Sequence, residues 1–156
     1  MTTDAERGRL RLWLRLLAAT NELERELRRR LRATYGTTLP RFDVMAALER
    51  APDGLSMGEL SRRLMVANGN TTVIVDALER EGLAARSVAP HDRRRVTVRL
   101  TAPGREAFAA MAAAHAGWVA ELLGGIDEQD AEELSRLLHD ARLAIRASAG
   151  QEEVAR

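Results

Sequence analysis

The sequence predicts a mainly α-helical protein that carries one small β-hairpin. Over most of the 156 residues, apolar side chains recur at spacings of three, four and seven, which is typical of amphipathic helices. Between residues 83 and 101 the spacing changes to two, which indicates strands. A highly charged segment separates the two expected strands. The chain is therefore expected to form several helices, then a hairpin with a charged tip, then further helices.

The composition fits one compact, soluble domain. Hydrophobic residues make up 46% of the chain and charged residues 30%, which argues against disorder. The absence of cysteine excludes disulfides, thiolate metal sites and a cysteine nucleophile. The N-terminus has no uninterrupted apolar run, and the apolar runs elsewhere are too short to cross a bilayer. We therefore expect a cytoplasmic protein with no membrane partner.

Charge is distributed unevenly along the chain, although the net charge is only +1. Residues 1–103 hold 19 Arg against 13 Asp or Glu, a net charge of +6. Residues 104–156 hold 5 Arg against 10 Asp or Glu, a net charge of −5. This polarity indicates a basic working end and an acidic remainder.

The first helix is expected to be long. Residues 3–6 form a capping box, in which Thr3 accepts from the backbone and Glu6 reaches back to it. Gly36 is a typical C-terminal stop. About 30 residues at ~1.5 Å each give a helix of roughly 45 Å. A domain of this size does not need such a helix, so we expect it to pack against a partner surface.

Three shorter helices are expected in the middle and two at the end of the chain. The first starts near Pro40, and the second opens at a capping box over residues 56–59. The third follows Asn68, a plausible N-cap, and ends at Gly82. The two final helices begin around residues 101–104 and at Asp127, and the last is expected to fray beyond Gly150. Its apolar stripe is Leu134, Leu137, Leu138, Ala141 and Ile145.

The helix after Asn68 has two different faces. Its core face is predicted to hold Thr71, Ile74, Val75 and Leu78. The side chains on the first half of the opposite face, where Asn70, Thr72 and Val73 lie, are short, mostly polar and nearly uncharged. Such a face can enter the DNA major groove, where Asn pairs with adenine and Thr or Val contacts a thymine methyl. The alternative is that Asn68 and Asn70 only form the turn and the cap.

The hairpin tip carries the strongest signal for function. The expected strands are residues 83–88 and 96–101, with Val96, Val98 and Leu100 on the buried side. The segment between them ends in Asp92, Arg93, Arg94 and Arg95. Adjacent guanidinium groups repel one another, and a narrow minor groove offers them concentrated negative potential. Asp92 is expected to fix the geometry of one Arg, although such charge runs are often simply solvated.

Residues 55–108 resemble the MarR family of bacterial transcription regulators. The matching pieces are Leu55-Ser56, Glu59-Leu60, residues 75–79, Gly82-Leu83, Asp92, Arg94, Leu100-Thr101 and Gly104-Arg105. The resemblance implies a winged helix-turn-helix at residues 37–101. N- and C-terminal dimerisation helices at residues 1–36 and 102–150 would flank it.

The resemblance also implies how such a protein works. A homodimer would bind a pseudo-palindromic duplex DNA operator and act as a repressor. Asn68, Asn70 and Thr72 would lie in the major groove, and Arg94, oriented by Asp92, would enter the minor groove. A small aromatic or lipophilic ligand would bind between the dimer helices and the winged domain and release the DNA. Five aromatic residues either line such a pocket or pack in the core or the dimer interface: Trp13, Tyr35, Phe42, Phe108 and Trp118.

Other functional classes find little support in the sequence. His91, His115 and His139 are scattered, without metal-ligand spacing, so no metal site is predicted. No phosphate-binding glycine motif or nucleophile pattern is present, so we expect neither a cofactor nor an enzyme. The remaining alternative is a winged-helix module that binds another protein and not DNA.

Overall fold

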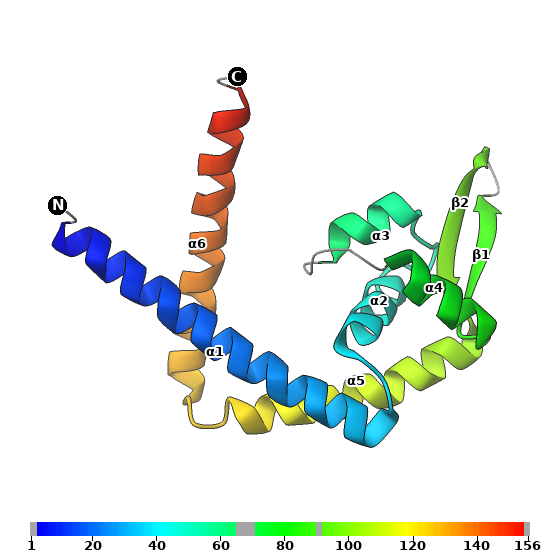
Figure 1. The fold of residues 1–156 in the computed structure, drawn as a ribbon, viewed down its shortest axis with the longest axis horizontal. Coiled ribbons are helices and arrows are strands. Elements are labelled where there is room, and N and C mark those ends of the chain that lie inside the picture. The colour runs from blue at the N-terminus through cyan, green and yellow to red at the C-terminus, as the bar shows by residue number, and fades with distance from the viewer. Residues whose placement is uncertain (1–2, 65–70, 90–91, 155–156) are drawn as a thin grey trace. The chain divides into compact units, whose positions relative to one another are not determined.

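The computed structural model describes residues 3–64, 71–89 and 92–154. This part of the chain forms α1 (Asp4–Tyr35), α2 (Leu39–Glu49), α3 (Met57–Arg63), α4 (Thr71–Arg80), β1 (Ala84–Ala89), β2 (Asp92–Leu100), α5 (Ala102–Leu122) and α6 (Glu128–Val154) (Figure 1). Contacts divide the chain into two compact units, Met1–Val119 and Ala120–Arg156. The predicted mainly α-helical fold with one β-hairpin is confirmed.

Local signals set the starts of several helices where the sequence places them. The Thr3 hydroxyl accepts a hydrogen bond from the Glu6 amide at 3.2 Å, and the Glu6 carboxylate accepts one from the Thr3 amide. Ser56 and Glu59 repeat this reciprocal pair before α3. These bonds satisfy amide groups that have no partner within a helix. Gly36, with φ of 61°, ends α1 in the left-handed conformation.

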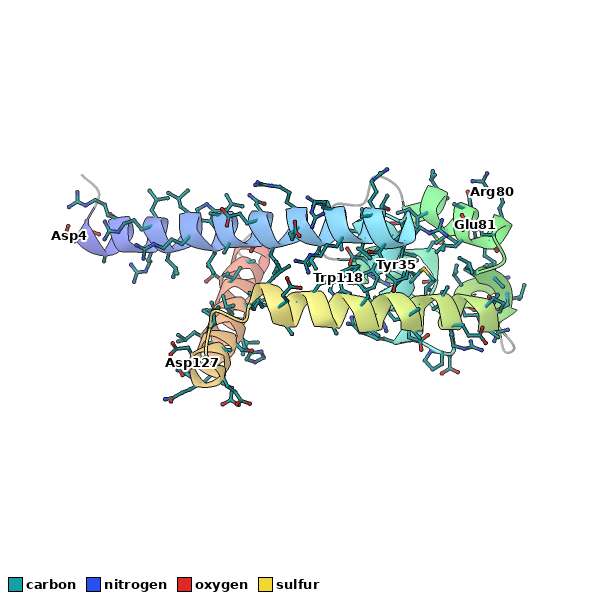
Figure 2. All side chains as sticks on the ribbon, turned by 90° about the horizontal axis from the view of Figure 1, so that it is seen from below. Asp4, Tyr35, Arg80, Glu81, Trp118 and Asp127 are labelled. Carbon is teal, nitrogen blue, oxygen red and sulfur yellow. The ribbon has the colours of Figure 1, made fainter. Side chains whose placement is uncertain are left out.

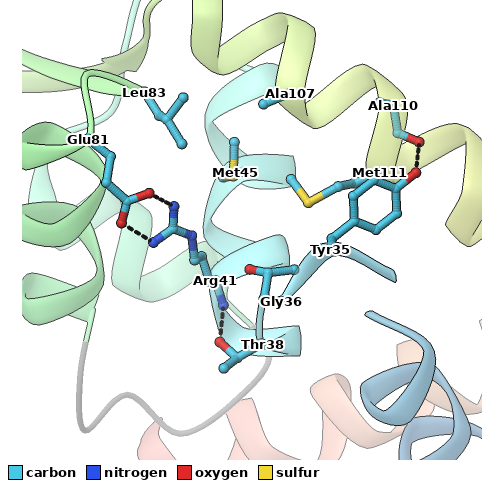
Figure 3. A pocket seen from close by; sticks show the side chains of 11 residues that line it. Tyr35, Gly36, Thr38, Arg41, Met45, Glu81, Leu83, Ala107, Ala110 and Met111 are labelled. Carbon is cyan, nitrogen blue, oxygen red and sulfur yellow. Dashed lines mark hydrogen bonds and ion pairs between the residues drawn. The ribbon is translucent and has the colours of Figure 1, made fainter. Parts of the chain in front are cut away.

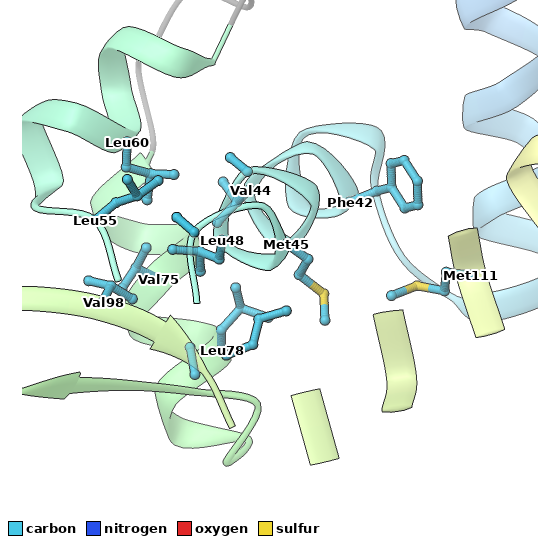
Figure 4. Close-up of a cluster of buried hydrophobic side chains, with 14 of the residues drawn as sticks. Phe42, Val44, Met45, Leu48, Leu55, Leu60, Val75, Leu78, Val98 and Met111 are labelled. Carbon is cyan, nitrogen blue, oxygen red and sulfur yellow. The ribbon is translucent and has the colours of Figure 1, made fainter. Parts of the chain in front are cut away.

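The hydrophobic core of the first unit lies between α2, α3, α4 and the hairpin (Figure 4). Its fully buried large side chains are Leu31, Val44, Met45, Leu48, Leu60, Val75, Leu78 and Val98. They come from five elements, with α2 contributing the most. Because such side chains interdigitate closely, the core holds the surface of α4 and the hairpin in a defined arrangement.

The hairpin is longer than its apolar alternation predicts. β1 and β2 pair antiparallel from Ala84 opposite Leu100 to Val88 opposite Val96, and after an irregularity Ala89 pairs with Asp92. β2 therefore begins at Asp92, and the expected start at residue 96 is wrong. Such an irregularity is a β-bulge, which accommodates the extra residues of β2. Backbone pairing therefore extends to Asp92, although this part of β2 is highly charged.

The two faces of β2 also differ from the prediction. Thr97 is only 7% exposed, whereas Val96 is largely exposed. The reason is a third segment that pairs with the edge of the hairpin. The Leu55 amide donates to the Val98 carbonyl at 2.9 Å, and the Val98 amide donates to the Leu55 carbonyl at 2.8 Å. The preceding Gly54 lies directly against Thr97, so that an added Cβ would be 3.0 Å from the Thr97 Cβ.

The last helix begins as predicted, and its C-terminal part is continuous. The Asp127 carboxylate accepts a hydrogen bond from the Asp130 amide at 2.8 Å, which confirms Asp127 as the N-cap of α6. The helix continues past Gly150 to Val154, over the residues where fraying was expected. A glycine inside a helix costs only about 1 kcal/mol, and good helix formers follow it here.

The carboxyl group of Asp43 on α2 lies in an environment that disfavours its ionised form. Burial raises the pKa of Asp43, the charge of Glu24 raises it further, and Arg28 opposes the shift. Because the pKa is higher in the folded than in the unfolded chain, ionisation of Asp43 favours unfolding. The contribution of Asp43 to the free energy of folding is therefore fully present below its ordinary pKa of 3.8. It is lost as the pH rises through the higher pKa that Asp43 has in the folded chain.

Replacing Asp43 with asparagine should therefore stabilise the protein at neutral pH. Thermal unfolding should show a higher Tm for D43N than for the natural chain near pH 7. The difference should shrink as the pH falls toward the ordinary pKa of 3.8, where Asp43 itself becomes neutral. A lower Tm for D43N at neutral pH would show that the ionised carboxylate stabilises the fold.

Candidate nucleic-acid interface

The face of α4 that points away from the core is the first part of the candidate interface. Thr71, Val75 and Leu78 are buried, which confirms the predicted core face, including the assignment of Thr71 to it. Thr72 lies on the exposed side, and Val73 is 56% exposed. A large apolar side chain exposed at the start of a helix is free to contact a partner, such as a thymine methyl group.

Two predicted base-reading residues lie outside the described residues. Asn68 and Asn70 precede the first described residue of α4, Thr71. Their roles as N-cap and base reader therefore stay predictions. The described part of α4 contributes Thr72 and Val73 to the candidate interface.

The wing is the second part of the interface. Asp92 and Arg94 are both exposed on β2. The Asp92 carboxylate accepts a hydrogen bond from the Arg94 amide at 2.9 Å. Asp92 thus orders the backbone of Arg94, the residue that it was expected to orient. The backbones of Arg93 and Arg95 lie in β2, and their side chains are outside the described part.

The charge of the Arg94 side chain is available to a partner. Within the described part of the chain, no carboxylate forms an ion pair with the Arg94 guanidinium. The wing also exposes Val88 and Val96, which face each other across the hairpin. An apolar pair next to an unpaired cation suits a surface that contacts both sugar and phosphate groups.

Arg86 connects the wing to α4 and was missed by the sequence analysis. Its guanidinium on β1 pairs with Asp76 at 2.8 Å and also with Glu79, both on α4. The Arg86 amide donates to Glu79 as well, at 2.8 Å. Hydrogen bonding to Asp76 is the main cause that raises the pKa of Arg86. We call Arg86, Asp76 and Glu79 the wing clamp.

The wing clamp changes the interpretation of one α4 residue. Asp76 lies on the same exposed face of α4 as Thr72 and Val73, and its side chain is half-exposed. Its carboxylate, however, is neutralised by Arg86. A bare carboxylate there would repel phosphate groups, so the clamp removes an unfavourable charge from the candidate interface. In the sequence, the feature that could have predicted a basic partner is the pair of acidic residues three positions apart on this helix.

Comparison with known proteins identifies this arrangement. Residues 35–95 match the model of the MarR family. The uncharacterized HTH-type transcriptional regulator YkoM of Bacillus subtilis is 32% identical over 108 residues, which are 69% of each chain. The chain belongs to the MarR family.

The MarR family assignment agrees with a second relative and with a solved structure. A MarR family transcriptional regulator from Silicibacter pomeroyi is 34% identical, with a TM-score of 0.80. The match covers 92% of this chain and 99% of that one. The transcriptional activatory protein BadR of Rhodopseudomonas palustris is 35% identical over 104 residues. Those residues are 65% of this chain and 59% of BadR, so the match spans less than two thirds of that protein.

The aromatic residues of this MarR family chain take different places. Phe42 is buried. Its ring centroid lies 5.4 Å from that of Phe108 and 4.6 Å from that of His115, on which the Phe42 ring stacks. Burial lowers the pKa of His115, which favours the neutral form of its ring. Tyr35 and Trp118 face each other between α1 and α5, with centroids 6.3 Å apart (Figure 2). Trp13 is exposed on α1.

Two negative observations complete the description. Across the described residues, no three His, Cys, Asp or Glu side chains gather closely enough to hold a metal ion. None of the described helices combines the length and apolar content needed to cross a membrane.

Proposed function

We propose that this chain represses transcription by binding a pseudo-palindromic DNA operator as a homodimer. The observation that carries the proposal is the wing clamp. Its ion pairs join the hairpin to α4, and so fix the position of the wing, with Arg94, relative to the exposed face of α4. A winged-helix protein reads DNA with such a pair of elements, one in each groove. Membership of a family of transcriptional regulators supports the same function.

In this proposal each groove of the DNA meets a different surface. Thr72 and Val73 of α4 contact bases in the major groove, together with Asn68 and Asn70. Arg94 enters the minor groove, flanked by Arg93 and Arg95. Asp92 orders the backbone at this point. Half-sites about one helical turn apart would match two copies of this surface.

Exposed apolar side chains support the dimer. In the N-terminal half of α1, the exposed large apolar side chains are Leu10, Leu12, Trp13, Leu14 and Leu17. On α6 they are Leu134, Leu137, Leu138, Leu143 and Ile145, which include most of the predicted stripe. Contiguous apolar surface of this kind is uncommon on a soluble monomer. We assign residues 1–36 and 102–150 to dimerisation and residues 37–101 to DNA binding.

The direction of regulation and its control are further parts of the proposal. BadR is named an activatory protein, so the relatives of this chain are not restricted to repression. We favour repression because a dimer covering an operator excludes other proteins from it. A small aromatic or lipophilic ligand would release the DNA. We place the protein in the cytoplasm, with no enzymatic activity of its own.

Selection from a random duplex library tests the proposal. The purified chain should enrich an inverted repeat, and sedimentation should show a dimer both free and on the selected duplex. Affinity should fall steeply between about 50 and 200 mM salt, because bound phosphates release counterions. Failure to enrich any repeat, or a monomer at the concentrations that bind DNA, would overturn the proposal. Placing the repeat between a promoter and a reporter gene then separates repression from activation.

A further inference from the structure

The apolar face of the hairpin extends beyond the hydrophobic core. On β2, Val98 is completely buried, whereas Val96, two residues nearer the tip, is 46% exposed. Side chains two residues apart on a strand point to the same face of the sheet, so Val96 continues the face that Val98 begins. Val88 of β1 lies directly opposite Val96 and is 54% exposed. We call Val88 and Val96 the wing pair.

The wing pair is apolar where a strand that faces only water is normally polar. Antiparallel strands with one wet face alternate apolar residues inside with polar residues outside. Next to the wing pair this order is reversed, because the polar Thr97 is buried and the two valines are exposed. Such a reversal at the tip of a hairpin indicates that a partner covers the valine side chains.

The register of the elements turns the wing pair toward α4. Arg86, two residues before Val88 on β1, pairs with Asp76 of α4. Arg86 and Val88 share one face of the hairpin, because side chains alternate along a strand. Thr72 and Asp76, four residues apart, share one side of α4. The wing pair therefore lies on the face of the hairpin that is turned toward α4, and the exposed Thr72 lies on the side of α4 that is turned toward the hairpin.

Ion pairs fix α4 to its neighbours on two sides. Glu81, which directly follows α4, pairs with Arg41 of α2, with 2.7 Å from Nη1 of Arg41 to Oε1 of Glu81 (Figure 3). The wing clamp joins α4 to β1. The exposed side of α4 and the wing pair are thus held in place before a partner arrives, so little conformational entropy is lost on binding.

We propose that the wing pair contacts the deoxyriboses of the DNA strand that separates the two grooves, and thereby makes binding selective for DNA over RNA at this point. The inference rests on the proposed function, in which α4 enters the major groove and the wing enters the adjacent minor groove. One sugar–phosphate strand then passes between the two elements, along the face that carries the wing pair. Arg94, exposed two residues nearer the tip than Val96, meets the phosphates of this strand.

The wing pair supplies a selectivity that arginine side chains lack. A guanidinium group binds the phosphates of DNA and RNA alike, because both carry the same charge. Deoxyribose has only carbon-bound hydrogens at its 2′ position, which the methyl groups of valine can cover. Ribose has a hydroxyl group there, on the minor-groove side. Covering that hydroxyl with valine leaves a polar group without a hydrogen bond, which weakens binding.

Single ribonucleotides in the selected duplex test the wing pair. Each deoxynucleotide of one half-site and its symmetry mate is replaced in turn, which adds one hydroxyl group to each half-site. Fluorescence anisotropy should show one or two positions at which binding by the natural chain weakens by about tenfold or more, because the added hydroxyl is buried without a partner. A scan in which no position weakens binding would overturn the inference.

Valine-to-threonine substitutions assign the effect to the wing pair. V88T and V96T keep the side-chain shape and introduce a hydroxyl group, which can form a hydrogen bond with the ribose hydroxyl. At the sensitive positions, the ribonucleotide should therefore weaken binding of these variants by less than about threefold. V73T is the matched control, since it introduces the same group at an exposed valine of α4, and it should show the full loss. An equal loss for the natural chain, V88T and V96T would refute the role of the wing pair.

The same measurements separate this inference from the proposed function. A chain that selects an inverted repeat but tolerates ribonucleotides at every position retains the proposed function and refutes the role of the wing pair. A chain that selects no repeat refutes both. Because Val88 and Val96 are exposed, V88T and V96T should have the Tm of the natural chain, and their tolerance of ribonucleotides then reports the contact and not a change in folding.

Discussion

Replacing Arg94 with alanine should weaken operator binding by about a hundredfold while the protein remains a folded dimer. The Arg94 side chain is exposed and has no carboxylate partner among the described residues, so the fold does not depend on it. Each charge-assisted contact is worth about 1.5–3 kcal/mol, and a dimer places two wings on the DNA. The slope of affinity against salt should also decrease, by about one for each lost phosphate contact.

Fluorescence anisotropy on the selected duplex measures this effect. R136A is the matched control, since it removes the same charge from α6, where Arg136 pairs with Glu133 and Asp140. It should change affinity only slightly. If R94A binds as tightly as the natural chain, the wing does not contact DNA. If R94A and R136A lose affinity equally, net charge and not position explains the result.

Replacing Gly104 with alanine should destabilise the protein by about 3 kcal/mol or more, at the upper end of overpacking effects. Gly104 lies in the first turn of α5, where an added Cβ would be 1.9 Å from the Leu83 carbonyl oxygen. The contact cannot open easily, because Thr101 holds the two segments together. Its hydroxyl donates to the Gly82 carbonyl at 2.6 Å, and its amide donates to the Leu83 carbonyl at 3.0 Å.

The same substitution elsewhere on α5 should have the opposite sign. An added Cβ at Gly117 meets nothing within 4 Å. G117A should therefore stabilise the chain by about 0.5–1 kcal/mol, since alanine favours helices over glycine. Urea unfolding of both variants measures the two effects. A stability for G104A within error of the natural chain would mean that α5 does not pack against Leu83 as the structure shows.

Part of the candidate site could be predicted because its signals are local. The buried positions of Thr71, Val75 and Leu78 follow from helical spacing alone, and this places Thr72 and Val73 on the outside. A run of three Arg residues cannot be buried, so the exposure of Arg94 was also predictable. These inferences depend only on the period of one element and on the cost of burying charge.

Other parts of the site depend on contacts between distant segments. The wing clamp joins Arg86 to carboxylates seven and ten residues earlier, on a different element. Arg41 and Glu81, which form another ion pair, are 40 residues apart. Each of the carboxylates Asp76, Glu79 and Glu81 could have been an ordinary solvated surface group. No periodicity in one segment indicates which other segment will face it.

The sequence by itself determined the helix caps, the core face of α4 and the family of the protein, because capping and amphipathic spacing act within one or two turns of chain. Only the tertiary structure decided that Thr97 is buried, that β2 starts at Asp92, and that Arg86 pairs with carboxylates of α4. The physical reason is the range of the interactions. A cap is satisfied by its neighbours in sequence, whereas a strand edge or an ion pair is satisfied by whichever distant segment the packed core brings beside it.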